Sequence, residues 1–190
     1  DGLSQDGTRE VAVGKGARVI EEKRKGYGRA YKTGFQEARG EVIVTLDGDC
    51  TYPADAIPQL FDMLDREKLD FITTDRFANL EEGAMSTMHR VGNFGLSLTA
   101  RLLFGRIIKD SQSGMWMFRK DALSNLDLTD DGMPLSEEIK IEAFKKLRAK
   151  EVPITYRRRV GEVKLSSWRD GWKNMKFLFK KRFVKKKRSS

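Results

Sequence analysis

The chain has 190 residues, of which 39% are hydrophobic, and it carries a formal net charge of +9. This length fits one compact domain, and no apolar run approaches the ~18 residues of a membrane-spanning helix. With one cysteine, Cys50, and one histidine, His89, the sequence excludes an internal disulfide, a thiolate zinc cluster and a multi-histidine metal site. A bound metal would therefore need oxygen ligands, which favours Mg²⁺ or Mn²⁺.

The first part of the chain alternates short β-rich runs with helical patterns. It begins inside an acidic loop, residues 1–8, so we expect a further strand and helix before it. Residues 17–21 predict a short strand and residues 29–39 a helix. Residues 41–46 form a nearly continuous apolar run that stops at Asp47, as expected of a buried parallel strand.

The same alternation continues along the chain. In order, we expect a helix opened by Pro53, a strand at residues 69–74, a helix at 86–104, a strand or a loop entering one at 113–118, a helix at 136–150 capped by Ser136, and a strand at 152–156. This order predicts an open, mostly parallel α/β sheet flanked by helices. Ligands of such sheets bind at the carboxyl ends of the strands, which is where Asp47 and Asp49 fall.

Asp47, Gly48 and Asp49 directly follow the predicted buried strand. Two carboxylates at positions i and i+2 converge on one hard cation if the chain bends there, and glycine lets the backbone approach a ligand. Mg²⁺ or Mn²⁺ held by Asp47 and Asp49 would neutralise charge on a nucleotide diphosphate. An ordinary Asp-Gly turn is the alternative, and the position between a buried strand and a helix favours the metal site.

Two further loops offer contacts to a phosphorylated ligand. The carboxylates of residues 1–8 could bond a base or a ribose, and capping of the next helix is the alternative. Residues 26–31 lead into a helix whose first N–H groups would bind an anion, with Lys25 and Arg29 as added phosphate contacts. Loop flexibility and solvated surface charge are the alternatives here.

Several motifs occur in a fixed order over residues 1 to about 165. They are Asp-Gly-x-Ser-x-Asp-Gly-Thr at residues 1–8, Gly-x-Gly-x-Ala-Tyr-x-x-Gly at 26–34, Asp-x-Asp at 47–49, Asp-x-x-Ser-Gly at 110–114, an acidic helix start at Glu137 and Glu138, and a segment at 159–165 similar to an Arg-x-Gly-x-Ser-Lys loop. This series resembles family 2 of the glycosyltransferases. Within the family it is most similar to the dolichyl-phosphate and polyprenyl-phosphate mannose and glucose synthases.

The resemblance implies the GT-A fold, the α/β fold of nucleotide-diphosphosugar transferases. It implies that Asp1 contacts the nucleotide, that Asp49 is the main metal ligand and that Asp47 lies near the sugar or ribose. Thr51 stands where the family often has a Gln as its third metal contact. Val163 replaces the family's Ser, so one hydroxyl contact to a phosphate would be lost.

The reaction implied is transfer of a hexose from a UDP- or GDP-hexose to a dolichyl or polyprenyl phosphate, by an inverting single displacement. Such an acceptor is already ionised near neutral pH and needs no strong general base, so catalysis would rest on positioning and charge stabilisation. Candidate contacts to the acceptor phosphate are Arg90, Arg119, Arg159 and Lys164, with surface salt bridges as the alternative. Asp110 and Gln112 are candidate contacts to the sugar or the acceptor, and a loop-capping Asp is the alternative.

After a catalytic domain at residues 1–165, residues 166–190 are expected to form a basic, amphipathic segment. Aromatic and apolar residues recur in it at helical spacing: Trp168, Trp172, Met175, Phe179 and Phe183. Lysines lie largely off this stripe, and residues 180–188 are almost wholly basic. Such a helix suits an anionic membrane surface, which would place the protein peripherally on the cytoplasmic face of a membrane. Packing of the helix on the domain is the alternative.

Three other functions compete with this interpretation. A family 2 enzyme with a saccharide acceptor would keep the fold and the metal site. A nucleic-acid-binding module would explain the basic tail but not Asp47 and Asp49, and we expect no nucleic-acid partner because no recognition motif is present. A nucleotidyltransferase would need a Gly-rich signature with a Lys near the true N-terminus, in a segment that we expect to precede residue 1.

Overall fold

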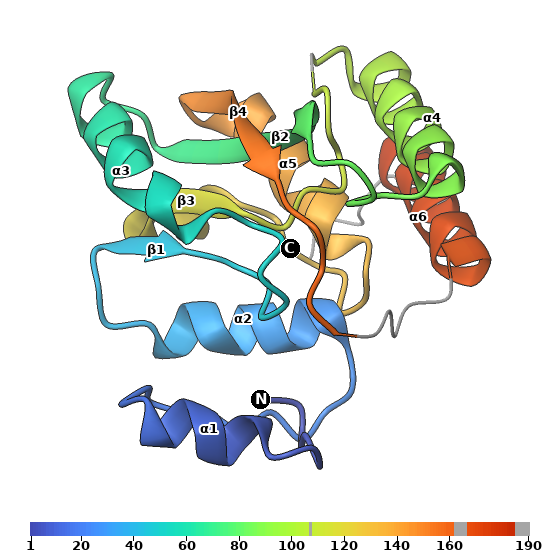
Figure 1. The fold of residues 1–190 in the computed structure, drawn as a ribbon. Helices are drawn as coiled ribbons and strands as arrows, with labels where there is room; N and C mark the ends of the chain where they lie inside the picture. Colours follow the sequence, from blue (N-terminus) through green and yellow to red (C-terminus); the bar gives the residue numbers. More distant parts are fainter. Residues whose placement is uncertain (107, 162–166, 185–190) are drawn as a thin grey trace.

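A mixed sheet lies at the centre of the computed structural model, which describes residues 1–106, 108–161 and 167–184 (Figure 1). Within these residues the strands are β1 (Val42–Val44), β2 (Phe71–Leu80), β3 (Trp116–Arg119) and β4 (Ala149–Tyr156), in the order β1-β3-β2-β4. Strand β3 is antiparallel to β1 and β2, whereas β2 and β4 are parallel. Strands β1, β2 and β4 therefore share one direction, which confirms the open, mostly parallel α/β sheet.

Helices flank the sheet. In chain order they are α1 (Thr8–Gly14), α2 (Tyr27–Glu37), α3 (Ile57–Arg66), α4 (Thr87–Phe104), α5 (Leu135–Lys146) and α6 (Ser167–Phe183), with 3₁₀ turns at Ala54–Ala56 and Lys120–Asn125. Figure 1 shows α2 and α3 on opposite sides of the sheet, and α4 and α6 side by side at one end of it.

The core alternates along the strands, because successive strand side chains point to opposite faces. On β2, Phe71 joins a cluster with Phe35 of α2 and Ile139 of α5. The next residue, Ile72, joins a second cluster with Leu64 of α3. Full burial of such side chains stabilises the fold by about 1.5–3 kcal/mol each, so α2 and α5 are held on one face and α3 on the other.

A third core cluster lies away from the sheet, between α4, α5 and α6. Leu96 and Ala100 of α4 meet Ile141 of α5 and Leu178 of α6, and Leu178 is fully buried. The inner face of α6 thus packs on the domain, which was the alternative to membrane contact considered for this helix. No helix in the described part of the chain is both long enough and apolar enough to cross a membrane.

Two sequence-based expectations for local structure are wrong. Residues 17–21 form no strand, because Asp1 supplies the backbone partners for Ile20 and Glu22 and one residue cannot make a ladder. The helix expected at 136–150 ends at Lys146, because Ala149 already pairs with Phe71 in the sheet. Its N-cap is Pro134, so Ser136 lies inside the helix and is not its cap.

Candidate active site

Asp47 lies just beyond β1, at the carboxyl end of the strand. The chain stays bonded to β3 through Thr45, whose N–H donates to the Trp116 carbonyl over 2.9 Å, and then leaves the sheet. The Tyr31 hydroxyl of α2 donates to Oδ1 of Asp47 over 3.3 Å. Burial, and then the neighbouring charge of Asp49, raise the pKa of the Asp47 carboxyl above its usual range.

Asp49 is held by contacts to both of its carboxylate oxygens. The Thr51 hydroxyl and N–H donate to Oδ1 over 2.6 and 3.1 Å, and Nη1 of Arg159 lies 2.6 Å from Oδ2. Cys50 adopts a φ of 62°, and this left-handed turn folds Thr51 back onto Asp49. Thr51 is fully buried, and its hydroxyl proton is directed to Asp49. Arg159 is thus brought to the aspartate pair by the segment that follows β4.

The segment at residues 110–114 passes close to Asp47. A Cβ on Gly114 would lie 3.6 Å from both carboxylate oxygens of Asp47 and 3.1 Å from the Tyr27 hydroxyl. The Gly114 N–H donates to the Tyr52 hydroxyl over 2.6 Å. Gly114 therefore lets this segment and α2 close around Asp47, which the spacing of the sequence motif did not reveal.

Asp110 lies beneath this site and does not line it. Its side chain has no exposed surface, and Arg76 donates to it from Nε over 2.6 Å and from Nη2 over 2.9 Å. The Lys140 ammonium donates to the Asp110 carbonyl over 2.8 Å. The expectation that Asp110 contacts sugar or acceptor is corrected, because a saturated, buried carboxylate cannot reach a ligand. The pair with Arg76 anchors the 110–114 segment to β2.

Gln112 is the partly exposed residue of the same segment. Its Nε2 donates to Oε1 of Glu137 over 2.5 Å and to the Ser111 hydroxyl over 3.1 Å. Its Oε1 accepts from Nδ2 of Asn174 over 2.8 Å. Burial raises the pKa of the Glu137 carboxyl to about 8, so this group is largely protonated near neutral pH.

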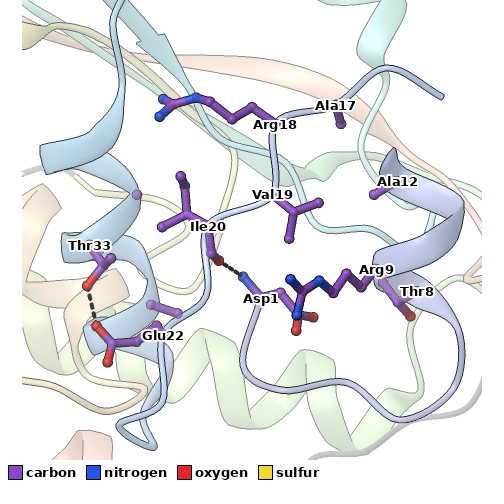
Figure 2. Close-up of a pocket in the computed structure, with 12 residues that line it drawn as sticks. Asp1, Thr8, Arg9, Ala12, Ala17, Arg18, Val19, Ile20, Glu22 and Thr33 are labelled. Carbon is purple, nitrogen blue, oxygen red and sulfur yellow. Dashed lines mark hydrogen bonds between the residues drawn. The ribbon is translucent and has the colours of Figure 1, made fainter. Parts of the chain in front are cut away.

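A pocket of about 400 Å³ lies between the N-terminal loop, α1 and α2 (Figure 2). Asp1 and Arg9 line one side and Glu22 and Thr33 the other. The Asp1 carboxylate accepts from the Ser4 hydroxyl over 2.6 Å. Hydrogen bonds from Arg24 and then from Thr33 hold the pKa of the Glu22 carboxyl below its usual range. The lining is mostly apolar and combines two carboxylates, Asp1 and Glu22, with two guanidinium groups, Arg9 and Arg18. Such a pocket fits a nucleoside, whose base and ribose combine apolar surface with hydrogen-bonding groups.

The N-terminus of α2 is engaged by the chain and is not an open anion site. The N–H groups of Gly28 and Arg29 donate to the carbonyls of Gly132 and Asp131 over 3.2 and 3.0 Å. The side chain of Arg29 pairs with the Asp131 carboxylate. Backbone carbonyls of the loop before α5 therefore occupy the position expected for a phosphate. Lys25 is exposed just before this helix.

The remaining candidate cations lie in different places. Arg119 pairs in register with Val42, at the opposite end of β1 from Asp47, and its guanidinium pairs with Asp65. A role for Arg119 at the acceptor phosphate is therefore corrected, because Arg119 lies at the other end of the β1–β3 pair from the aspartates and is already paired with Asp65. Arg90 is exposed on α4, in a shallow apolar pocket with Phe77. Lys164 lies outside the described residues.

Sequence reasoning did not identify several residues that shape the site: Glu22, Tyr27, Tyr31, Arg76, Glu137 as a hydrogen-bond partner, and Asn174. Two of these had a visible signal, because Tyr31 and Tyr27 fall within the glycine-rich motif at 26–34. Asn174 had none, since it is one polar residue on an amphipathic helix.

The donor set at Asp47 and Asp49 fits a divalent cation. Both groups offer hard carboxylate oxygens. Burial first, and then the negative charge of Asp49, raise the pKa of the Asp47 carboxyl, and a cation would offset the second of these effects. No third acidic, histidine or cysteine side chain of the described residues joins them in a metal-sized group. A cation here would leave coordination positions for ligand oxygens, as Mg²⁺ and Mn²⁺ sites at phosphates commonly do.

Comparisons with known proteins agree with these features. The family described as Glycosyl transferase family 2 matches residues 1–127. The low-salt glycan biosynthesis hexosyltransferase Agl6 of Haloferax volcanii is 38% identical over 178 residues, covering 92% of this chain and 43% of Agl6. The dolichyl-phosphate hexose transferase of the same organism is 35% identical, over 88% of this chain and 73% of that protein. The dolichol-phosphate mannosyltransferase of Pyrococcus furiosus is 31% identical, over 75% and 41%.

A solved structure gives the fold. Glucosyl-3-phosphoglycerate synthase from Mycobacterium tuberculosis, in complex with Mn²⁺, UDP and glucosyl-3-phosphoglycerate, superposes with a TM-score of 0.76 at 19% identity, covering 96% of this chain and 66% of that one. The chain spans less than half the length of Agl6, so it corresponds to one part of that relative. The chain belongs to glycosyltransferase family 2, has the GT-A fold and is close in sequence to the dolichyl-phosphate sugar transferases.

Proposed function

We propose that this chain catalyses metal-dependent, inverting transfer of a hexose from a nucleotide-diphosphate sugar to a dolichyl or polyprenyl phosphate. The carrying observation is the aspartate pair beyond β1, with Arg159 2.6 Å from Asp49. Carboxylates that hold a cation, next to a guanidinium, suit a reaction in which one anion, the nucleotide diphosphate, leaves the sugar carbon and another anion, the acceptor phosphate, attacks it. Relatives named for dolichyl phosphate support the acceptor, and a neighbour in complex with Mn²⁺ and UDP supports the cation and donor class.

Each part of the site has a role in this proposal. Asp1 binds the nucleoside in the N-terminal pocket, which Glu22 shapes through its hydrogen bonds to Arg24 and Thr33. Asp49 and Asp47 hold Mg²⁺ or Mn²⁺, which when bound neutralises the leaving diphosphate. Thr51 orients Asp49 through its 2.6 Å hydrogen bond, and we assign it this role in preference to that of a direct ligand. Arg159 and Lys164 attract the acceptor phosphate, which attacks as an anion and needs no base.

The membrane partner is supported by apolar side chains that α4 and α6 expose to solvent. On α4 they are Met88, Val91, Phe94, Leu98 and Leu102, and on α6 they include Trp172, Phe179 and Phe183. At about 100° per residue, the α4 stripe lies on the opposite side of the helix from the buried Leu96 and Ala100. Exposed basic residues accompany both helices: Arg90, Lys173, Lys176, Lys180 and Arg182. Apolar side chains beside cations suit the interface of an anionic bilayer, where the lipid acceptor resides.

A thermal-shift experiment tests the donor and the metal together. We expect UDP-hexoses or GDP-hexoses to raise the melting temperature by roughly 2–6 °C, and to do so only with Mn²⁺ or Mg²⁺ present. Asp49→Ala should abolish this shift, whereas Asp62→Ala, an exposed change on α3, should keep it. A transfer assay then compares dolichyl phosphate with saccharide acceptors. If no sugar nucleotide stabilises the protein, or if Asp49→Ala responds like the wild type, the proposal is wrong.

A further inference from the structure

Helix α6 contributes a buried polar side chain to the active-site region. Asn174 is 3% exposed, and its Nδ2 donates to Oε1 of Gln112 over 2.8 Å. Gln112 in turn donates to Oε1 of Glu137, which is fully buried at the start of α5. Three elements distant in sequence, α6, the 110–114 segment and α5, therefore meet through one chain of hydrogen bonds.

Two hydrogen bonds hold the terminal amide of Gln112 from opposite sides. A carboxamide has an acceptor end and a donor end, and here each end is bonded to a different helix. Asn174 supplies the donor, and Glu137 accepts on the opposite side. Oδ1 of Asn174 and Oε2 of Glu137 are buried without a hydrogen-bond partner among the described residues. The order of both side chains therefore depends on their bonds to Gln112.

Gln112 lies on the backbone that borders the aspartate pair. Its N–H donates to Oδ1 of Asp110 over 3.1 Å, and Asp110 is clamped by Arg76. Two residues further on, Gly114 lies against the Asp47 carboxylate. The backbone of this segment is thus anchored from β2, whereas the partly exposed side chain of Gln112 is oriented from α5 and α6.

We propose that Asn174 is a positioning residue for the transfer reaction, acting through Gln112 and Glu137, so that α6 is part of the substrate site and not a separate appendage. This inference rests on the proposed function in one respect, namely that Gln112 faces the sugar or the acceptor. A displacement of catalytic groups of about 1 Å costs up to about 100-fold in rate, so loss of one orienting bond has a measurable effect.

The test is a double-mutant cycle on the transfer rate, using Asn174→Leu, Gln112→Leu and the double variant, with Asn125→Leu, the same substitution at an exposed position away from the site, as the control. We expect Asn174→Leu to lower kcat roughly 10- to 100-fold with KM for the sugar nucleotide nearly unchanged. In the Gln112→Leu background the same substitution should have little further effect, because it acts through Gln112. Additive losses, or an unchanged kcat in a folded Asn174→Leu protein, would overturn the inference.

A second measurement does not depend on transfer. The side-chain amide signals of Gln112 in ¹⁵N NMR, assigned by their loss in Gln112→Leu, should move to averaged values in the milder variant Asn174→Ala. Unchanged signals would refute positioning by Asn174. If the wild type transfers no sugar to any acceptor while these signals do move, the proposed function fails and the structural part of the inference stands.

Discussion

Gly28 shows how one residue determines the approach of two elements. A Cβ at this position would lie 2.7 Å from the Asp130 carbonyl oxygen and 2.9 Å from the Asp131 carbonyl carbon. Both are backbone atoms, so the loop before α5 would have to move. The loop carbonyls that accept from α2 leave no room for any larger residue, which explains the glycine without invoking a bound phosphate.

Gly28→Ala should therefore destabilise the protein by about 1–3 kcal/mol, because the added methyl group overlaps the loop backbone. Gly34→Ala, in the same helix but with open space around its Cβ, should instead raise stability by about 0.4–1 kcal/mol. Urea unfolding measures both. Equal or greater stability of the Gly28→Ala protein would show that the loop does not pack against α2 as described.

Glu137 predicts a pH dependence of stability. Its pKa of about 8 lies above the ordinary value of 4.5 because its carboxyl is buried. A folded-state pKa raised above the unfolded value contributes stability that is complete below the unfolded pKa and is lost as the pH rises through the folded pKa. Relative to Glu137→Gln, the wild type should thus lose on the order of 2 kcal/mol from about pH 5 to about pH 8.

Urea unfolding of both proteins across this pH range measures the difference. Glu82→Gln, at an exposed position, serves as the control and should follow the wild type at every pH. Parallel curves for the wild type and Glu137→Gln would mean that Glu137 ionises normally in the folded protein.

At the scale of elements, hydrophobic periodicity and capping residues correctly predicted several strands and helices. The apolar run before Asp47 became β1, the helical spacing at 86–104 became α4, and Ser86 caps that helix by accepting from the His89 N–H. The reversed direction of β3 was not predictable, because alternating strands read the same both ways. Nor was it predictable that Glu137, Glu138 and Lys140 of α5 would all be buried.

The burial of α5 depends on partners distant in sequence. Lys181 of α6 lies 3.0 Å from both Glu138 and Glu142, and Glu138 also accepts from the N–H groups of Thr129 and Asp130. A buried charge is tolerated when it is paired and hydrogen-bonded, so the acidic start of α5 can be buried because α6 and the preceding loop supply its partners. The same distinction holds at the active site. The aspartate pair is local in sequence and could be identified from it, whereas Tyr31 and Gly114 reach the pair only through the fold and could not be assigned to it.

For the whole molecule, α6 connects two surfaces that the sequence suggested were separate. Its inner face carries Asn174, Leu178 and Lys181 into the domain, and its outer flank exposes Trp172 and Phe179. Met175 lies one helical turn from both aromatics and packs in the cluster shared with α4. The exposed aromatic side of α6 is therefore next to the contact between α6 and α4. Under the proposed function, the helix that rests on lipid is also the helix that orients Gln112.

Vesicle flotation tests the lipid-facing surface. Phe94→Asp with Leu102→Asp should reduce binding to phosphatidylserine-containing vesicles roughly tenfold, because each places a charge where apolar area would enter the interface. Leu102 is 75% exposed and Phe94 60%, so neither change should alter the melting temperature. Phe61→Asp, at an aromatic position on α3 that is 49% exposed, is the control and should float like the wild type, since α3 lies on a different part of the molecule (Figure 1). Equal flotation of all three proteins, or no binding of the wild type at physiological salt, would remove the membrane from the proposal and favour a soluble acceptor at the same catalytic site.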